Sequence, residues 1–500
     1  RAGPRLKTPV SGPMVSEASS HRLAMSHRFS PLAACSIALA LGSCVAASPT
    51  DVVDTGVVAD ATERDVGSTD AIDDVSELDT PGDADAETDA GADAAIDAEP
   101  DLAEDIANDV AIDTVADSSL DTVDAGEPRA DLDDLLAQLR ANPESAARAL
   151  STEYGWPIRV AGGRLVVQLE PLLPLVAGHH DEWAGTEMTV ETGFSWVVVP
   201  LSGGHAYKFT DGADQWQADP LSRAYGVDEN GPISYVEPTI AHSERWLDVT
   251  DGVLPARTLR IWMPEELATH VLYAHDGQNL FYDGGIFGSW SLEASAPPGL
   301  MVVGIDNAGA DRIYEYTHVS DFRGDTQGGG GALYAAFVQE HVRPLIHTAY
   351  TEPPVVGTLG SSLGGLISLY IAHAYPGEYD MAISLSGTVG WGKIGADNNT
   401  LLDLYGAAGL RSTRLYIDSG GGVDGGAGAC MDSDDDGIND DNESNADNFC
   451  ENRQLADALA ASGYVWEESL WHWHELDAEH NEAAWAARVA RPMKLFVAAE

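Results

Sequence analysis

The C-terminal half of the sequence alternates short apolar segments with amphipathic segments of helical period. The apolar segments read HVLYAHDG, LMVVGIDN, PPVVGTLG, DMAISLSG and RLYIDSG, and the helical patterns include ALYAAFVQEHVRPLIHTAY and NRQLADALAASG. Because the apolar segments are apolar at nearly every position, they predict strands that are buried on both faces. Such strands in alternation with helices form a mainly parallel sheet flanked by helices. We therefore predict an α/β fold for residues 239–500.

One of these strand–helix junctions contains a Gly-x-Ser-x-Gly pattern centred on Ser362, in the segment VVGTLGSSLGGLISLY. The pattern follows a predicted buried strand and opens a helix, which is the setting of a nucleophile elbow. Small residues at Gly360, Gly364 and Gly365 let the turn close tightly. We predict that Ser362 is a nucleophile. The alternatives are an ordinary glycine-rich turn, or Ser361, which occupies the variable position of the motif.

A serine nucleophile needs a histidine base and a carboxylate that orients it, and on this fold their order along the chain is Ser, Asp or Glu, then His. His480 lies in a loop directly before the last amphipathic helix, and we predict that it is the base. We expect the acid just past the strand RLYIDSG. Asp424 in the following loop is the prediction, and Asp418 inside the strand is the alternative.

Two further features of the hydrolase region carry predictions. The oxyanion hole is expected to use the N–H of Leu363 and that of Gly277 or Gln278, in the glycine-containing loop YAHDGQNLF. His472 and His474 alternate in WHWHE and would share one face of a strand. A metal pair is conceivable for them, but structural histidines are the favoured interpretation because no third ligand is evident.

Several blocks of this region together resemble one family: HDGQNLF, RIYEYTHVSDFRGDTQGGGGALYAAFVQEHVRPLIHTAY, GSSLGGLISLY, SLSGTVGW and EHNEAAW. They are similar, in the same order, to the esterase D and enterochelin-esterase-like family of α/β-hydrolases. The resemblance implies an α/β-hydrolase fold and serine carboxylic-ester hydrolysis of siderophore, feruloyl or acetyl esters, or acyl transfer on the same fold. It marks Ser362 and His480 directly, and Asp424 through likeness to the family's acid loop.

An acidic insertion at residues 425–451 departs from that family pattern. Its positions match an EF-hand-type calcium loop, with expected ligands Asp432, Asp434, Asp436, Ile438, Asp440 and Glu443. The aspartate-rich segment also resembles thrombospondin type 3 loops. A solvated acidic insertion is the alternative to structural Ca²⁺ binding, and catalysis itself needs no cofactor. Cys430 and Cys450 flank the insertion, and in an oxidising compartment they predict a disulfide.

Residues before the hydrolase region form several segments. Residues 129–156 have leucines at helical spacing, interrupted at Asn142–Pro143, and residues 157–238 contain short β-rich runs that predict a small β-sandwich. The latter resembles the immunoglobulin-like domain of enterochelin esterases and glycogen-branching enzymes, on the stretches DEWAG, YKFTDGADQWQADP and NGPISYV. In relatives this domain binds glycans or packs against the hydrolase. Trp183 and Trp216 are therefore sugar platforms or core aromatics; the core is favoured because a small sandwich needs large side chains.

The N-terminal region predicts export. Residues 1–24 look like upstream translation, and Met25 starts a short basic and then apolar segment that ends in LGSC, which resembles a lipobox with Cys44 as the lipidated residue. Residues 1–44 are thus expected to comprise a lipoprotein signal; cleavage near VAA, giving a secreted protein, is the alternative. Residues 45–128 are rich in Asp and Glu without aromatic residues, which predicts a disordered acidic linker.

Composition limits the function classes. The chain has 81 acidic and 26 basic residues, so no basic surface is expected for nucleic acid. We predict an extracytoplasmic, membrane-anchored serine esterase that acts on a small-molecule or glycan-linked ester. An acyltransferase, or a non-catalytic surface glycan-binding lipoprotein, is the alternative.

Overall fold

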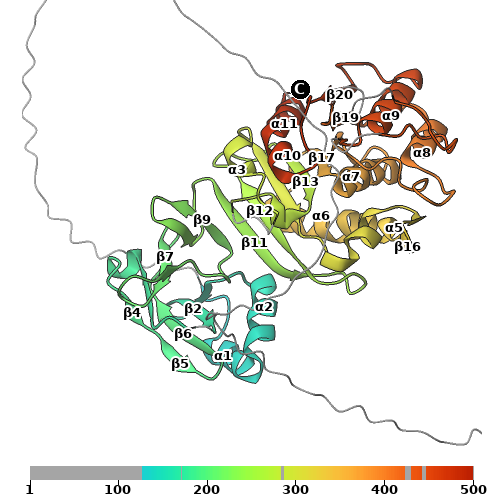
Figure 1. Ribbon diagram of the computed structural model, residues 1–500. Coiled ribbons are helices and arrows are strands. Elements are labelled where there is room, and N and C mark those ends of the chain that lie inside the picture. The colour runs from blue at the N-terminus through green and yellow to red at the C-terminus, as the bar shows by residue number, and fades with distance from the viewer. Residues whose placement is uncertain (1–126, 171, 283–286, 423–429, 442–445, 499–500) are drawn as a thin grey trace, which may run out of the picture. The chain divides into compact units, whose positions relative to one another are not determined.

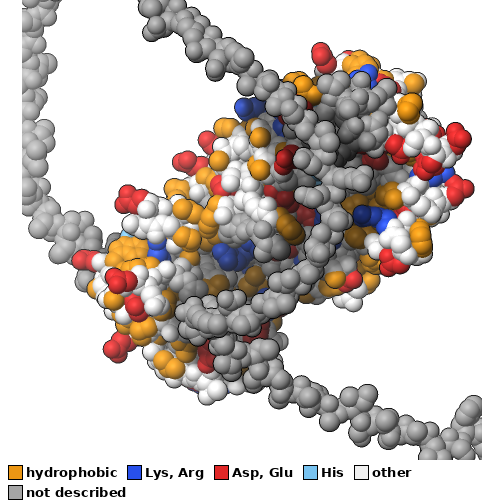
Figure 2. Space-filling view, in the orientation of Figure 1, with side chains coloured by type: hydrophobic (Ala, Val, Ile, Leu, Met, Phe, Trp, Pro, Cys, Tyr) orange, Lys and Arg blue, Asp and Glu red, His pale blue; other side chains and the backbone are white. Residues whose placement is uncertain are grey.

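The computed structural model describes residues 127–170, 172–282, 287–422, 430–441 and 446–498 (Figure 1). All of them belong to the compact unit Ala111–Glu500. The predictions for the signal segment, Cys44 and most of the acidic linker lie outside the described residues. No helix in the described part of the chain has the length and apolar character needed to cross a membrane. Figure 2 shows acidic side chains at many places on the described surface, in keeping with a net charge of −55.

The described chain begins with a helical hairpin, α1 (Leu132–Ala141) and α2 (Pro143–Glu153). The break between them lies at Asn142, whose side chain accepts a hydrogen bond from Ser145 N (3.3 Å) and so caps α2, with Pro143 as the first helical residue. The leucines of α1 pack with Ile158, Leu165 and Val167 in one buried core. The hairpin therefore covers one face of the first sheet.

Two sheets follow. The smaller has the order β1-β2-β6-β5, with β1 (Ile158–Val160), β2 (Gly163–Leu169), β5 (Thr189–Glu191) and β6 (Phe194–Val199). Val166 of this sheet shares a buried core with Tyr207 and Phe209 of the larger sheet, so the two sheets face each other. The facing strands of the larger sheet are β3 (Leu175–Gly178), β4 (Thr186–Glu187), β7 (Ala206–Thr210), β8 (Trp216–Gln217), β9 (Ala224–Asp228) and β10 (Gly231–Tyr235).

The larger sheet continues without interruption into the hydrolase region, because β9 pairs with β11 (His242–Val249). From there its order is β11-β12-β14-β13-β17-β18-β19-β20. The last six strands are parallel, and β11 and β12 are antiparallel to their neighbours. Their bounds are β12 (Arg257–Met263), β13 (His270–His275), β14 (Leu300–Ile305), β17 (Val355–Ser361), β18 (Met381–Leu385), β19 (Arg414–Ser419) and β20 (Leu470–His474).

Helices cover both faces of this parallel sheet. On β13, Val271 and Tyr273 belong to one buried core with α5, α6 and α7, whereas Leu272 and Ala274 belong to a second core with α10 and α11. The helices and short turns are α3 (Leu292–Ser295), α4 (Arg312–Tyr316), α5 (Gly331–Ala336), α6 (Arg343–Tyr350), α7 (Leu363–Ala374), α8 (Leu401–Ala408), α9 (Phe449–Ala461), α10 (Glu482–Arg488), α11 (Ala490–Val497), η1 (His179–Asp181), η2 (Gly277–Asn279), η3 (Gly309–Asp311) and the π-helical η4 (Phe337–Val342). A hairpin of β15 (Ser320–Phe322) and β16 (Thr326–Gly328) completes the fold. The predicted α/β-hydrolase sheet flanked by helices is confirmed.

Candidate active site

Ser362 lies at the sharp turn between β17 and α7, with φ 53° and ψ −124°. Residues other than glycine are rare in this backbone region, and a serine there is the strained geometry of a nucleophile elbow. The turn is held by Ser362 N, which donates to Leu385 O (2.9 Å), and by Thr388 N, which donates to Ser362 O (3.2 Å). Ser362 is half-buried, whereas Ser361 is a buried residue of β17.

The glycines of the motif are required by close contacts. A Cβ atom on Gly360 would lie 2.4 Å from the carbonyl carbon of Gly364, and one on Gly365 would lie 2.5 Å from Ser384 Oγ. These distances are far below a normal van der Waals contact. Helix α7 can therefore approach the sheet at this point only because both positions are glycine.

His480 pairs with a buried carboxylate. Its Nδ1 lies 2.5 Å from Oδ1 of Asp447, whose side chain is 0% exposed, while the His480 side chain is 35% exposed. The ring packs edge-on against Trp485, with centroids 5.0 Å apart. A carboxylate bonded to Nδ1 fixes the imidazole tautomer and leaves Nε2 as the basic atom.

A short chain of contacts connects this pair to the elbow. Ser386 follows β18, the strand whose end binds Ser362, and its hydroxyl donates to Asp447 Oδ2 (2.5 Å). Among the described residues no hydrogen bond joins the Ser362 hydroxyl to His480. Catalytic hydrogen bonds are often long before substrate binds, so the two groups can still act together.

The carboxylate at His480 is not one that the sequence suggested. Asp424 lies outside the described residues. Asp418 is buried in β19, where its Oδ1 accepts from Arg488 Nε (3.1 Å); among the described residues no hydrogen bond or ion pair joins it to His480. Asp447 was missed because the segment between β19 and α9 holds many aspartates, and no local pattern distinguishes it from them.

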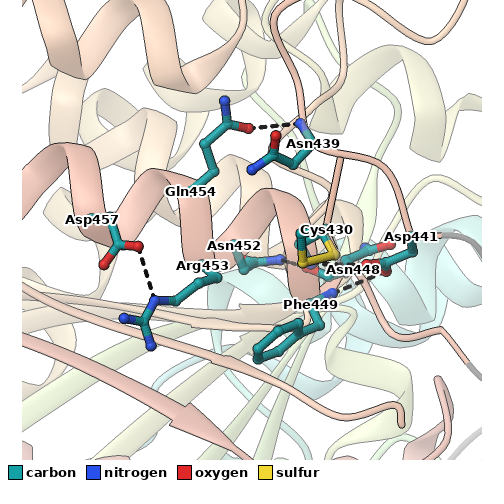
Figure 3. The surroundings of a disulfide bond; sticks show 10 residues. Cys430, Asn439, Asp441, Asn448, Phe449, Asn452, Arg453, Gln454 and Asp457 are labelled. Atoms are coloured by element: carbon teal, nitrogen blue, oxygen red, sulfur yellow. Dashed lines mark hydrogen bonds and ion pairs between the residues drawn. A yellow bond between two sulfur atoms is a disulfide. The ribbon is translucent and has the colours of Figure 1, made fainter. Parts of the chain in front are cut away.

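Side-chain amides position Asp447 by docking its segment on the loop after β18. Asn448 Nδ2 donates to Ser386 O (2.9 Å), and Asn452 Nδ2 donates to Gly387 O (2.6 Å). Figure 3 shows both amides beside the disulfide between Cys430 and Cys450, which attaches the acidic insertion to the first turn of α9. The predicted disulfide is thus confirmed, and it lies close in sequence to Asp447.

The predicted oxyanion loop lies next to the elbow. Gly277 and Gln278 form the short turn η2 after β13, and Leu363 is the first residue of α7. A Cβ on Gly277 would come 2.7 Å from the carbonyl carbon of Gly304, so a glycine is needed there. A Cβ on Gly364 would lie 3.2 Å from Asp276 Oδ2, which shows how closely the loop and the helix approach each other.

Asp276 anchors the oxyanion loop. It is buried with a left-handed backbone (φ 59°), and its carboxylate accepts from Arg312 Nε and Nη2 (2.7 and 2.8 Å) and Asn307 Nδ2 (2.6 Å). Burial alone would raise the pKa of Asp276, but the charge and hydrogen bonds of Arg312 outweigh it and lower that pKa. Asp276 is therefore ionised, and bidentate pairing fixes the loop.

The hydrolase region is similar to known proteins. Residues 254–494 match the family model described as Putative esterase. The matched segment, 241 of the 500 residues, is called the esterase domain after the model that it matches. A curated relative, the uncharacterized protein YbbA of Bacillus subtilis (strain 168), is 29% identical over 145 residues. That alignment covers 26% of this chain and 57% of the relative, so the chain spans little more than half of the relative's length.

Several solved structures are similar to this chain at low sequence identity. The enterochelin esterase from Shigella flexneri is 15% identical, with 67% of this chain and 92% of that chain covered and a TM-score of 0.36. An IroE-like serine hydrolase from Shewanella oneidensis is 17% identical over 51% of this chain and 80% of its own, with a TM-score of 0.39. The siderophore hydrolase EstA from Aspergillus nidulans is 17% identical over 51% and 94%, with a TM-score of 0.37.

The two histidines of β20 are structural residues of the esterase domain. Both rings pack near Phe449 of α9, at centroid distances of 5.8 Å for His472 and 4.3 Å for His474. Burial lowers the pKa of His472 to about 4, so that ring is neutral. The one group of possible metal ligands among the described residues contains neither histidine.

That group lies in the acidic insertion of the esterase domain. Carboxylate oxygens of Asp432, Asp434 and Asp436 all lie within 4.8 Å of one another. Asp432 accepts from Asp436 N (3.0 Å) and Gly437 N (2.9 Å), and Gly437 has φ +95°. A cavity of about 200 Å³ is lined by two residues of this cluster, three more acidic residues and one lysine: Asp434, Asp436, Asp440, Asp441, Glu451 and Lys393. The expected ligand Glu443 lies outside the described residues, while Ile438 lines the same cavity.

The two tryptophans that precede the esterase domain line a pocket of about 510 Å³ together with Lys208, Asp228 and Asn230. Their ring centroids are 6.3 Å apart, and Trp216 is 46% exposed. Lys208 Nζ donates to Asp228 Oδ1 and to Asn230 O, both at 3.3 Å. The interpretation of Trp216 as a core aromatic is therefore wrong: β8, which carries it, is a two-residue edge strand that leaves the ring open to solvent.

Proposed function

We propose that the chain is a serine carboxylic-ester hydrolase that works through an acyl-enzyme. The observation that carries the proposal is the 2.5 Å contact between His480 and the buried Asp447. The segment of Asp447 docks on the loop after β18, which also holds the strained elbow of Ser362. A nucleophile, a base and an orienting carboxylate are the parts that this chemistry needs. In this proposal Asp447 takes the role that the sequence suggested for Asp424.

The reaction would proceed in two halves. Ser362 Oγ attacks the ester carbon while its proton passes to His480 Nε2, and the carbonyl oxygen becomes an oxyanion between the N–H groups of Leu363 and of Gly277 or Gln278. The intermediate collapses, the C–O bond to the alcohol breaks, and His480 returns the proton to the leaving alkoxide. Water then attacks the acyl-enzyme by the same steps, releasing the acid and restoring Ser362. Oxyanion donors of this type contribute roughly 10²–10³-fold to kcat.

The test uses the full chain with p-nitrophenyl acetate and a fluorophosphonate probe. We expect wild-type protein to release p-nitrophenol and to carry one label on Ser362, and Ser362→Ala to lose both. Ser361→Ala, one residue earlier in β17, is the matched control and should keep them. Wild-type protein that is folded but neither hydrolyses the ester nor labels would leave the proposal without support.

The substrate proposal covers siderophore, feruloyl and acetyl esters. A panel of these esters with a shared assay of acid release would rank them by kcat/KM. The same acyl-enzyme could pass its acyl group to an alcohol, so adding an alcohol acceptor and measuring the ester formed distinguishes an acyltransferase from a hydrolase. A dominant transfer product would reassign the reaction to acyl transfer.

We also propose that the acidic insertion binds structural Ca²⁺. Oxygen ligands at the spacing of Asp432, Asp434 and Asp436 suit a hard cation, and Ile438 would contribute its carbonyl. Asp440 and Glu443 complete the proposed ligand set. Burial and the neighbouring Asp434 raise the pKa of Asp436, which indicates that the cluster has too little positive charge around it.

A glycan-binding role is proposed for the pocket of Trp183 and Trp216. Exposed indole faces stack on sugar rings, and the polar groups of Lys208, Asp228 and Asn230 offer hydrogen bonds to hydroxyls. Affinity electrophoresis in gels with soluble starch or xylan tests it: Trp216→Ala should migrate faster than wild type. Trp466→Ala, which removes another exposed tryptophan, is the control. Equal migration of all three proteins in every gel would remove the glycan role.

For localisation we propose an extracytoplasmic protein. The disulfide between Cys430 and Cys450 is of the kind that persists in oxidising compartments. Attachment to a membrane through a lipid on Cys44 is part of the same proposal. Metabolic labelling with a clickable fatty acid in a bacterial host, with Cys44→Ala beside it, would reveal the lipid; an unlabelled wild-type protein would leave a secreted form.

A further inference from the structure

Behind the His480–Asp447 pair, one buried arginine lies between two buried carboxylates. Arg488, the last residue of α10, donates from Nη2 to Asp447 Oδ2 (3.1 Å) and from Nε to Asp418 Oδ1 (3.1 Å). The Arg488 side chain is 3% exposed and both carboxylates are 0% exposed. A single guanidinium thus pairs with two carboxyl groups that are shielded from solvent.

The hydroxyl of Ser386 forms hydrogen bonds with the same buried groups. It accepts hydrogen bonds from Trp485 Nε1 (3.1 Å) and Arg488 Nη2 (2.5 Å), so its own hydrogen points to Asp447 Oδ2 (2.5 Å). Gly420 N also donates to Asp447 Oδ2. Oxygen Oδ2 therefore receives three donors from three different segments, and Oδ1 alone faces His480. The carboxylate cannot rotate without breaking several buried hydrogen bonds.

The charges around Arg488 are out of balance. Two ionised carboxylates and one guanidinium would leave a buried negative charge, which is costly. Burial raises the pKa of Asp418 to about 7, although Arg488 opposes the rise. The other titratable groups acting on this corner are Tyr416, Arg491 and Asp441, from β19, α11 and the insertion; burial raises the pKa of Tyr416 and of Asp441. Asp418 therefore takes up a proton near neutral pH.

We propose that Arg488 is a positioning residue for the ester hydrolysis proposed above: it holds the Asp447 carboxylate with Oδ1 toward His480, while Asp418 is a second buried partner that gives Arg488 its own anchor. The inference rests on the proposed function. It assigns Arg488 an effect on rate through Asp447 and assigns Asp418 an effect on stability alone.

The test separates rate from stability. Arg488→Met should lower kcat by roughly ten- to a hundredfold, with KM nearly unchanged. This is the range found for groups that orient a metal-ligating side chain through a hydrogen bond, a role similar to that of Arg488 at Asp447. The acid limb of its kcat/KM profile should move to higher pH, because a positive charge behind Asp447 is lost. Arg488→Lys should recover part of the rate.

A double variant keeps the test decisive where Arg488→Met folds poorly. Arg488→Met/Asp418→Asn removes both the cation and the anion that it anchors, so its melting temperature should recover toward wild type while kcat stays low. Asp418→Asn alone should keep kcat within a few-fold of wild type. Arg343→Met, which breaks a largely buried ion pair between Arg343 of α6 and Glu352, should lower stability and leave the pH profile in place.

Two results would overturn the inference: kcat recovering together with stability in the double variant, or Arg488→Met having wild-type kcat and pH profile. Both are read against wild-type protein that hydrolyses p-nitrophenyl acetate and labels at Ser362. Wild-type protein without activity or label would instead contradict the proposed function, so the two failures are distinguishable.

Discussion

The stretch after β19 contains a buried carboxylate, Asp447, which with the groups bonded to it forms the buried set. It also contains the exposed carboxylates of Asp432 and Asp434, the exposed set, and the surroundings of the two sets are opposite. Asp447 is fully buried and bonded to a hydroxyl, a backbone N–H, an arginine and a histidine. Asp432 and Asp434 are exposed, and within the described part of the chain their side chains receive backbone donors at most and form no ion pair with a lysine or arginine. The comparison teaches that the protein supplies hydrogen-bond donors to the carboxylate that it buries. A cluster without such partners is suited to an external cation.

The largest effect, on kcat, should come from replacing the histidine of the buried set. His480→Gln removes the proposed base and should lower kcat at least roughly 10⁴-fold, since triad members act as a unit. His474→Gln is the matched control, because that ring only packs on Phe449 and bonds Gly421 O. Steady-state hydrolysis of p-nitrophenyl acetate measures both; similar losses in the two variants would count against a special role for His480.

The covalent link between the two sets has the next largest effect. Replacing Cys430 and Cys450 with serine opens a loop of sequence separation 20. Loop-closure entropy then predicts a loss of about 3 kcal/mol in the free energy of unfolding. Urea titration of wild-type and doubly substituted protein checks this. An unchanged midpoint would mean that the insertion is held to α9 by its hydrogen bonds alone.

Removing a cation should affect only the exposed set. With Ca²⁺ at about a hundred times its Kd, the bound protein gains about 2.7 kcal/mol of stability, and EDTA should remove that gain. Differential scanning calorimetry should show a lower melting temperature in EDTA for wild type and no response for Asp434→Asn. A wild-type melting temperature that is the same in Ca²⁺ and EDTA would leave the cluster a solvated insertion.

The last prediction concerns the pH dependence of stability from Glu451, measured in EDTA. Burial and the nearby Asp441 raise its pKa to about 8, although it accepts hydrogen bonds from Val389 N and Gly390 N. The folded state therefore holds a proton that the unfolded chain releases near pH 4.5, so the free energy of unfolding falls as pH rises between these values. Glu451→Gln should flatten that slope in urea titrations at pH 5 and pH 8.5; an equal slope would assign it to other groups, such as Asp418.

Much of the site was accessible from sequence because its parts are local. The elbow combines a buried strand, small residues and a helix within a few positions around Ser362, and the oxyanion loop combines a strand end with Gly277. The parallel sheet followed from segments that are apolar on both faces. Each of these signals is a pattern of adjacent residues, and the structure has the parallel strands, the sharp turn at Ser362 and the short turn at Gly277 at the predicted positions.

The contact between Asp447 and His480 was not accessible from sequence, for the opposite reason. Asp447 reaches His480 because Asn448 and Asn452 dock its segment on the loop after β18, which is some sixty positions away in the chain. No local pattern distinguishes it from the other aspartates of the insertion. The continuous pairing of β9 with β11, and the exposure of Trp216, are likewise tertiary outcomes that short strand patterns do not determine.

The central claim is that Asp447 is the carboxylate that supports His480. The most direct measurement compares kcat of Asp447→Asn and Asp424→Asn on p-nitrophenyl acetate, with folding checked by circular dichroism. The account predicts that Asp447→Asn loses kcat by about 10⁴-fold, as expected when the imidazole takes the wrong tautomer, and that Asp424→Asn stays near wild type. The reverse pattern would contradict it.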